Sequence, residues 1–169
     1  MKQQILLEMI IKDPHKFASN KGNKLPYFKE FFKNKSTGDF QVLLSDKIKN
    51  KHFGNKTFDC VLSHSNGNIH AIEYKTMGSS IQKNLNNRKE EMLGQAFHAR
   101  LLNIQDFSYI WIFNLSDPKE KKARKGIEQI YNVGLRIKKD GYLKNNIMLI
   151  YDNGKMSFLG HDNFENFKL

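Results

Sequence analysis

Asp59, Glu73 and Lys75 are the residues whose types and spacing can do chemistry together. Asp59 lies in the apolar segment 57–63, and the other two lie in the apolar segment 68–76. Both segments have the composition and length of β-strands. Side chains two positions apart on a strand share a face, so Glu73 and Lys75 point the same way. Whether Asp59 joins them depends on the turn between the strands.

That turn, Ser-Asn-Gly-Asn at residues 65–68, contains the Asn-Gly pair that is typical of a β-hairpin. A two-residue loop would set Asp59 opposite Tyr74. A three-residue loop or a bulge would set it opposite Glu73, about 4.5–5.5 Å away. The chemistry requires the second register. The apolar pattern tolerates it, because these residues then share the opposite face: Phe58, Cys60, Leu62, Ile72 and Tyr74.

Two carboxylates at this separation repel each other unless a cation lies between them. Oxygen ligands suit Mg²⁺, which takes one or two carboxylates together with waters and phosphate oxygens. Lys75 can orient or deprotonate an attacking water, or stabilise the charge that develops on a phosphate. The pattern predicts a Mg²⁺ site, with Mn²⁺ as a substitute, for phosphodiester hydrolysis. The alternative is that Glu73 and Lys75 form an exposed pair worth at most about 1 kcal/mol.

The periodicity of apolar residues predicts an α/β fold with a mixed sheet, because a hairpin leads into a helix and then into a buried strand. No shift in composition marks a domain boundary, so we expect one domain over residues 1–169. The lysine-rich segment 47–56 reads as a connector. The basic segment 117–138 holds a helix that we expect to break near Gly126 or Gly134. The other predicted elements are helices 3–12, 26–34 and 82–103, and strands 39–44, 57–63, 68–76, 107–114, 146–151 and 155–159.

The charge of the chain points to a polyanionic partner. Lys and Arg number 28 against 17 Asp and Glu, which gives a formal net charge of +11. Nucleic acid is the simplest such partner, although an AT-rich genome explains an excess of Lys and Asn equally well. Only four of the basic residues are Arg, the usual reader of guanine. Lys suits contact with the phosphate backbone better than recognition of bases.

Several classes of protein are excluded by the composition. The single cysteine, Cys60, excludes an internal disulfide framework and a cysteine-rich zinc site. No apolar run approaches the roughly 18 residues of a membrane span. The N-terminus has neither the long apolar stretch nor the cleavage site of a signal peptide. We therefore expect a soluble cytoplasmic protein that does not contact a membrane.

The Phe-Asp pair at 58–59, the hairpin and the Ile-Glu-Tyr-Lys run at 72–75 resemble the core motif of the PD-(D/E)XK nuclease superfamily. In that motif an Asp precedes a hairpin, and (D/E)-X-K ends an apolar strand. The order of elements is similar over about 57–114, together with the helix 3–12. The resemblance implies a restriction-endonuclease-like αβββαβ core with a mixed central sheet flanked by helices. It also implies a metal-dependent deoxyribonuclease without a small-molecule cofactor.

The resemblance implies roles for six positions. Asp59 and Glu73 would be Mg²⁺ ligands, and Lys75 would be the catalytic lysine. The main-chain carbonyl of Tyr74 would complete the metal site. Two helical positions would add a further ligand and a further catalytic residue, Glu8 and Gln95 respectively.

Polar and basic residues near the motif and in the basic segment are candidates for contact with DNA, and their alternative is a solvated surface. They are Lys56, Ser79, Ser80, Gln82, Lys83, Lys121, Lys122, Arg124 and Lys125. The sequence favours a type II restriction-like endonuclease that acts as a homodimer on duplex DNA. A Holliday-junction resolvase or another structure-selective nuclease of the same superfamily is the first alternative. A basic nucleic-acid-binding module without catalysis is the second.

Overall fold

The computed structural model describes residues 29–33 and 40–169. The predicted helix 3–12, and with it Glu8, lies outside the described residues. Of the predicted helix 26–34, residues 29–33 are described and are helical. No helix within the described part of the chain is long and apolar enough to cross a membrane.

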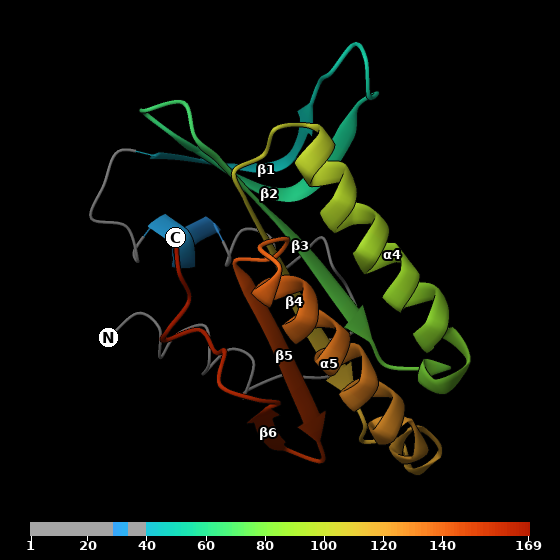
Figure 1. Ribbon diagram of the computed structural model, residues 1–169. Coiled ribbons are helices and arrows are strands. Elements are labelled where there is room, and N and C mark those ends of the chain that lie inside the picture. The colour runs from blue at the N-terminus through green and yellow to red at the C-terminus, as the bar shows by residue number, and fades with distance from the viewer. Residues whose placement is uncertain (1–28, 34–39) are drawn as a thin grey trace.

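A six-stranded mixed sheet forms the centre of the molecule, with its strands in the order β1-β2-β3-β4-β5-β6 (Figure 1). The pairs β1–β2 and β2–β3 are antiparallel, the pairs β3–β4 and β4–β5 are parallel, and the pair β5–β6 is again antiparallel. The strands are β1 (Phe40–Ile48), β2 (Lys56–His64), β3 (Ile69–Met77), β4 (Asp106–Asn114), β5 (Asn145–Asp152) and β6 (Lys155–Phe158). The predicted α/β class with a mixed sheet is confirmed.

Two long helices make the crossovers between the parallel strands, and both cover the same face of the sheet (Figure 1). They are α4 (Ile81–Leu101) and α5 (Arg124–Lys139), with the 3₁₀ helix η1 (Pro118–Ala123) before α5. The opposite face of the sheet packs against aromatic residues from the two ends of the described chain, namely Phe31, Phe32, Phe164 and Phe167.

Strand β4 is buried on both faces, as its continuous apolar run predicts. On the helix side, the rings of Tyr109 and Trp111 stack with centroids 4.7 Å apart, and those of Trp111 and Phe113 stack at 5.5 Å. On the other side, Ile110 and Ile112 join the second core cluster. This buried strand pairs with β3 in parallel and so fixes the position of β3 in the sheet.

The β2–β3 hairpin has the register that the predicted chemistry requires. The His64 amide donates to the Asn68 carbonyl, which closes a three-residue loop, and Gly67 takes the positive φ of 86° that such a loop needs. Cys60 pairs with Ile72 as the last pair of the ladder toward the site. Asp59 and Glu73 are therefore the next residues on the two strands, where the pairing ends.

Helix α5 runs without a break through both glycines, so the predicted break near Gly126 or Gly134 is wrong. The glycines serve close packing instead. A Cβ at Gly126 would lie 2.3 Å from the Cδ1 of Leu85, and one at Gly134 would lie 2.2 Å from the Nδ2 of Asn146. Each glycine lets the helix approach a neighbour at a distance that a larger residue would prevent.

Two further expectations are corrected. The connector is shorter than 47–56, because β1 extends through Ile48 and β2 begins at Lys56.

Phe58 does not share a face with Cys60, contrary to the expected alternation. It packs in the helix-side core, with its ring 5.9 Å from that of Phe107. The β2–β3 ladder stops at Cys60, so the alternation of faces is no longer enforced by β3 beyond that point.

The start of α4 depends on Glu120 from η1. Its carboxylate accepts the backbone N–H groups of Ser80 at 2.7 Å and Ile81 at 2.8 Å, and the side chain is buried. Ser80 itself makes no side-chain cap. We expect Glu120→Ala to lower the free energy of unfolding by about 1–3 kcal/mol, because the buried Ile81 amide and the partly buried Ser80 contact lose their partner at the positive end of the helix.

Urea unfolding measures this loss. The matched control is Glu128→Ala, which removes the same charge from an exposed position on α5. We expect the control to change stability by less than about 0.5 kcal/mol. Equal effects of the two substitutions would contradict a capping role for Glu120.

Candidate active site

Asp59 lies at the point where β2 separates from β3. Its Oδ2 accepts the backbone N–H of Tyr74 at 2.9 Å, so the carboxylate takes the place of a strand partner for that amide. The Tyr74 side chain points to the opposite face, where it is buried in the second core cluster. The backbone N–H of Tyr74 is therefore next to the Asp59 carboxylate, and the role of the Tyr74 carbonyl as a metal ligand stays a prediction.

Glu73 is buried, with 5 % of the residue exposed, and its carboxyl group lies beside that of Asp59. Burial raises the pKa of Glu73 to about 7, and the Asp59 charge and a hydrogen bond between the two carboxyl groups act in the same direction. Lys56 works against this rise, since its Nζ donates to the Oε1 of Glu73 at 2.8 Å. The geometry brings Lys56, predicted only as a contact for DNA, into direct contact with Glu73.

Lys75 is held by a carboxylate that the sequence analysis did not identify. Its Nζ donates to the Oε1 of Glu91 at 2.9 Å, and Arg88 Nη1 donates to the other oxygen at 2.6 Å. Burial favours a higher pKa for Glu91, but the hydrogen bonds from Lys75 and Arg88 outweigh it and lower the pKa. Gln95 reaches the same carboxylate at 3.5 Å, so it lies beside Glu91 and Lys75.

The signal that could have revealed Glu91 is the face of the helix. Arg88, Glu91 and Gln95 recur at intervals of three and four residues, next to the buried stripe of Leu85, Met92 and Ala96. Such a polar stripe beside a core stripe indicates a helix edge that faces a partly buried site. The sequence does not show which element packs against this polar stripe. The fold shows that it is β3, through Lys75.

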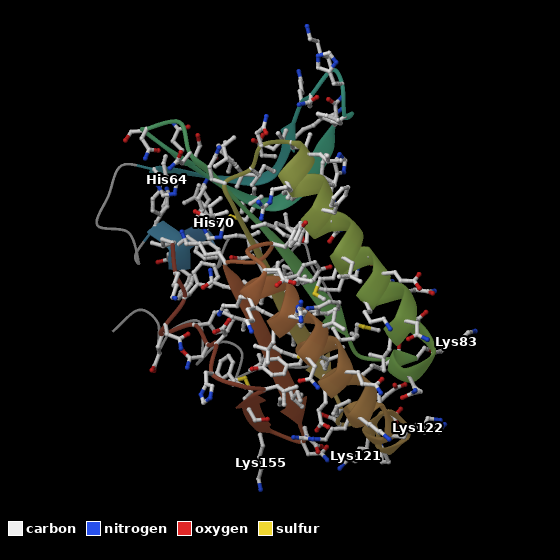
Figure 2. The ribbon with its side chains drawn as sticks, viewed as in Figure 1. His64, His70, Lys83, Lys121, Lys122 and Lys155 are labelled. Atoms are coloured by element: carbon white, nitrogen blue, oxygen red, sulfur yellow. The ribbon has the colours of Figure 1, made fainter. Side chains whose placement is uncertain are left out.

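The remaining candidates for DNA contact gather at the end of the molecule where α4 and α5 begin, and Figure 2 shows Lys83, Lys121 and Lys122 there. A groove of about 350 Å³ in this region is lined by Gln82, Lys122 and Lys125. Ser79, Ser80 and Arg124 lie in the adjoining loop and at the start of α5. Lys83 lies eight residues before Glu91 on α4, which is about 12 Å along the helix.

The carboxylate pair suits a small hard cation. The two groups are close enough for Asp59 to raise the pKa of Glu73, and a bound cation would replace this repulsion by attraction. Within residues 29–33 and 40–169, no group of three or more His, Cys, Asp or Glu side chains converges on one point. Mg²⁺ needs no such group, because it keeps several waters and often binds through one or two carboxylates.

Comparison of the chain with protein-family models, with curated proteins and with solved structures found no match in any of the three.

The raised pKa of Glu73 makes stability depend on pH. Its folded-state pKa lies above the ordinary 4.5, so ionisation of Glu73 costs folding free energy. The cost appears as pH rises from about 4.5 through about 7 and is fully present above that range. We expect Glu73→Gln to be more stable than the unsubstituted chain at pH 8, by on the order of 1 kcal/mol or more.

Urea unfolding at several pH values between 4 and 8 checks this expectation. The advantage of Glu73→Gln should shrink toward pH 4, where Glu73 is protonated in both the folded and unfolded states. Glu128→Gln at an exposed position is the control and should show no such trend. An advantage that stays constant with pH, or grows on acidification, would contradict the assigned environment of Glu73.

Proposed function

We propose that this chain is a metal-dependent DNA endonuclease of the PD-(D/E)XK type. The observation that carries the proposal is the meeting of the Asp59 and Glu73 carboxyl groups at the end of the β2–β3 ladder, with Lys75 two residues along the same strand. Two carboxyl groups held together in a mostly buried position oppose folding at neutral pH. Carboxyl groups with pKa values perturbed in this way cluster at functional sites.

The residues at this point have complementary roles in the proposal. Asp59, Glu73 and the Tyr74 carbonyl would hold Mg²⁺. A bound Mg²⁺ supplies a Lewis acid and lowers the pKa of a coordinated water. Lys75, oriented by Glu91, would point its ammonium group at the phosphate or at the attacking water and stabilise developing negative charge. Gln95 and Arg88 would keep Glu91 in place.

The order of elements supports the same proposal. Strands β1, β2 and β3, helix α4 and strand β4 follow one another in the βββαβ order of the restriction-endonuclease-like core. The segment from η1 to β6 extends the sheet on the side away from the carboxylates.

The basic cluster at the start of α4 and α5 would bind the DNA backbone at a distance from the reacting phosphate. The separation of about 12 Å between Lys83 and Glu91 along α4 corresponds to about three to four base pairs at 3.4 Å each. Lys83, Lys122 and Lys125 would therefore hold phosphates that flank the cleavage point. Lysines in such positions supply affinity without reading bases.

The arginines favour recognition of DNA shape over recognition of sequence. Each of the four has a partner within the chain: Arg88 with Glu91, Arg100 with the Gly141 carbonyl, Arg124 with Glu128 and Arg136 with Asp140. Arginine is the commonest reader of guanine, and these contacts oppose such a use. A structure-selective nuclease is therefore the favoured form of the proposal, and a type II restriction-like enzyme is the other candidate.

Cleavage of a four-way junction compared with a linear duplex of the same sequence separates these two candidates. We expect the junction to be cut faster, because backbone contacts by lysine respond to shape. Discrete fragments from linear DNA, with no preference for the junction, would favour the restriction-type enzyme instead.

Substitution of the three central residues tests the nuclease proposal. We expect Asp59→Ala, Glu73→Ala and Lys75→Ala each to reduce the rate of cleavage by at least about 10²-fold, equivalent to 2.7 kcal/mol of barrier. Binding to DNA in Ca²⁺ should remain. Lys155→Ala, at the β5–β6 turn, is the control for loss of a lysine and should cleave normally.

Any one of the three that retained near-normal cleavage would be removed from the catalytic set. A chain that binds DNA equally with and without divalent cation, and cuts neither a plasmid nor a junction, would be the non-catalytic basic module.

A further inference from the structure

Three cationic side chains balance three carboxylates around the candidate site. The carboxylates belong to Asp59, Glu73 and Glu91, and the cations belong to Lys56, Lys75 and Arg88. Lys75 and Arg88 both bind Glu91, so neither depends on the proposed metal ligands. Lys56 is different, because its partner is Glu73.

Lys56 contacts one of the two carboxylates that the proposed metal site would use. Its Nζ lies 2.8 Å from Glu73 Oε1, with side-chain exposures of 22 % for Lys56 and 7 % for Glu73. The ammonium also donates to the Thr57 carbonyl at 3.3 Å and lies 5.2 Å from the centroid of the Phe58 ring. An ammonium group and a divalent cation repel each other at contact distance, so the contact of Lys56 with Glu73 weakens binding of a cation to the same carboxylate.

We propose that Lys56 is a resident counter-ion that excludes divalent cations from Glu73 until a nucleic-acid phosphate binds its ammonium group. The proposal rests on the metal site of the proposed function. Lys56 is the first residue of β2 and follows the exposed loop 49–55, so its side chain can leave Glu73 without disturbing the core. Its stem keeps the ammonium within one side-chain length of the carboxylates. A phosphate placed beside a bound cation lies within that reach.

The consequence is coupling between the two ligands. Without nucleic acid, a cation must displace Lys56 from Glu73 and leave the ammonium without an anionic partner. With a phosphate present, the displaced ammonium gains a new partner, so the cost falls. By linkage, nucleic acid strengthens binding of the cation, and the cation strengthens binding of nucleic acid by the same factor. The chain would then assemble its complete site only on its substrate.

Binding of Mn²⁺ without nucleic acid, measured by electron paramagnetic resonance of free Mn²⁺, tests whether Lys56 competes with the cation for Glu73. We expect Lys56→Gln and Lys56→Met to bind Mn²⁺ about tenfold more tightly than the unsubstituted chain, which corresponds to 1.4 kcal/mol. The Met variant keeps the aliphatic stem over Phe58, and thermal melting confirms that each variant is folded. Lys56→Arg keeps the charge and should remain close to the unsubstituted chain.

The control for net charge is Lys51→Gln, in the exposed loop five residues earlier. We expect it to change the Mn²⁺ affinity by less than about twofold, because charges that contact solvent are screened. Neutral variants at Lys56 that bind Mn²⁺ no more tightly than the unsubstituted chain would overturn the proposal. Equal tightening by Lys51→Gln would overturn it too, because the effect would then be general electrostatics.

The same measurement with a non-cleavable phosphorothioate duplex tests the coupling. The unsubstituted chain should bind Mn²⁺ more tightly when the duplex is present, and Lys56→Gln should gain less. A gain that is identical in both would overturn the role of the phosphate. If Lys56→Gln binds Mn²⁺ more tightly but the unsubstituted chain cuts no DNA, the counter-ion role of Lys56 is supported and the nuclease function is rejected. If the unsubstituted chain cuts DNA but Lys56→Gln binds Mn²⁺ no more tightly, the nuclease function is supported and the counter-ion role is rejected.

Discussion

The register of the β2–β3 hairpin is the constraint on which the site depends. The three-residue loop closed by His64 and Asn68 sets Cys60 opposite Ile72, and the ladder ends there. A slip of one residue would set Asp59 opposite Tyr74 and transfer one strand's side chains to the other face of the sheet. Because the ladder stops at this point, the Tyr74 amide is satisfied by the Asp59 carboxylate and not by a strand carbonyl.

The helices extend this constraint into a three-dimensional site. Glu120 of η1 binds the first amides of α4 and so fixes where that helix begins. Ten residues later the helix brings Glu91 to Lys75, and the ion pair orients the lysine. The glycines of α5 allow the second helix to approach α4 and β5 closely. The segment after β4 therefore stabilises a helix that carries part of the site, although it contributes none of the central residues itself.

Much of this arrangement could be predicted from local patterns. The Asn-Gly turn, the alternation around Asp59 and Glu73, and the aromatic run of β4 each report directly on strands, and each of those strands is confirmed. The break in α5 was predicted wrongly because a glycine that weakens an isolated helix can also permit close packing. The face of Phe58 was predicted wrongly because strand alternation was extended past the end of the ladder.

The sequence alone could not predict the ion pairs of the site, Lys56 with Glu73 and Lys75 with Glu91. Glu91 is 18 positions after Glu73 and Lys56 is 17 before it, and no local pattern links such distant residues. Their contacts follow from the way α4 crosses β3 and from the way β2 begins beside it. The sequence indicated the carboxylate pair and its lysine, whereas the side chains that orient and neutralise them required the tertiary structure.

The most direct measurement of the central claim is incubation of the purified protein with supercoiled plasmid and with a four-way junction, in Mg²⁺ and in EDTA. We predict cleavage of at least one of these DNAs in Mg²⁺ and none in EDTA. Both DNAs remaining intact in Mg²⁺, with binding that is unchanged by EDTA, would contradict the nuclease proposal and leave the carboxylate pair without a catalytic role.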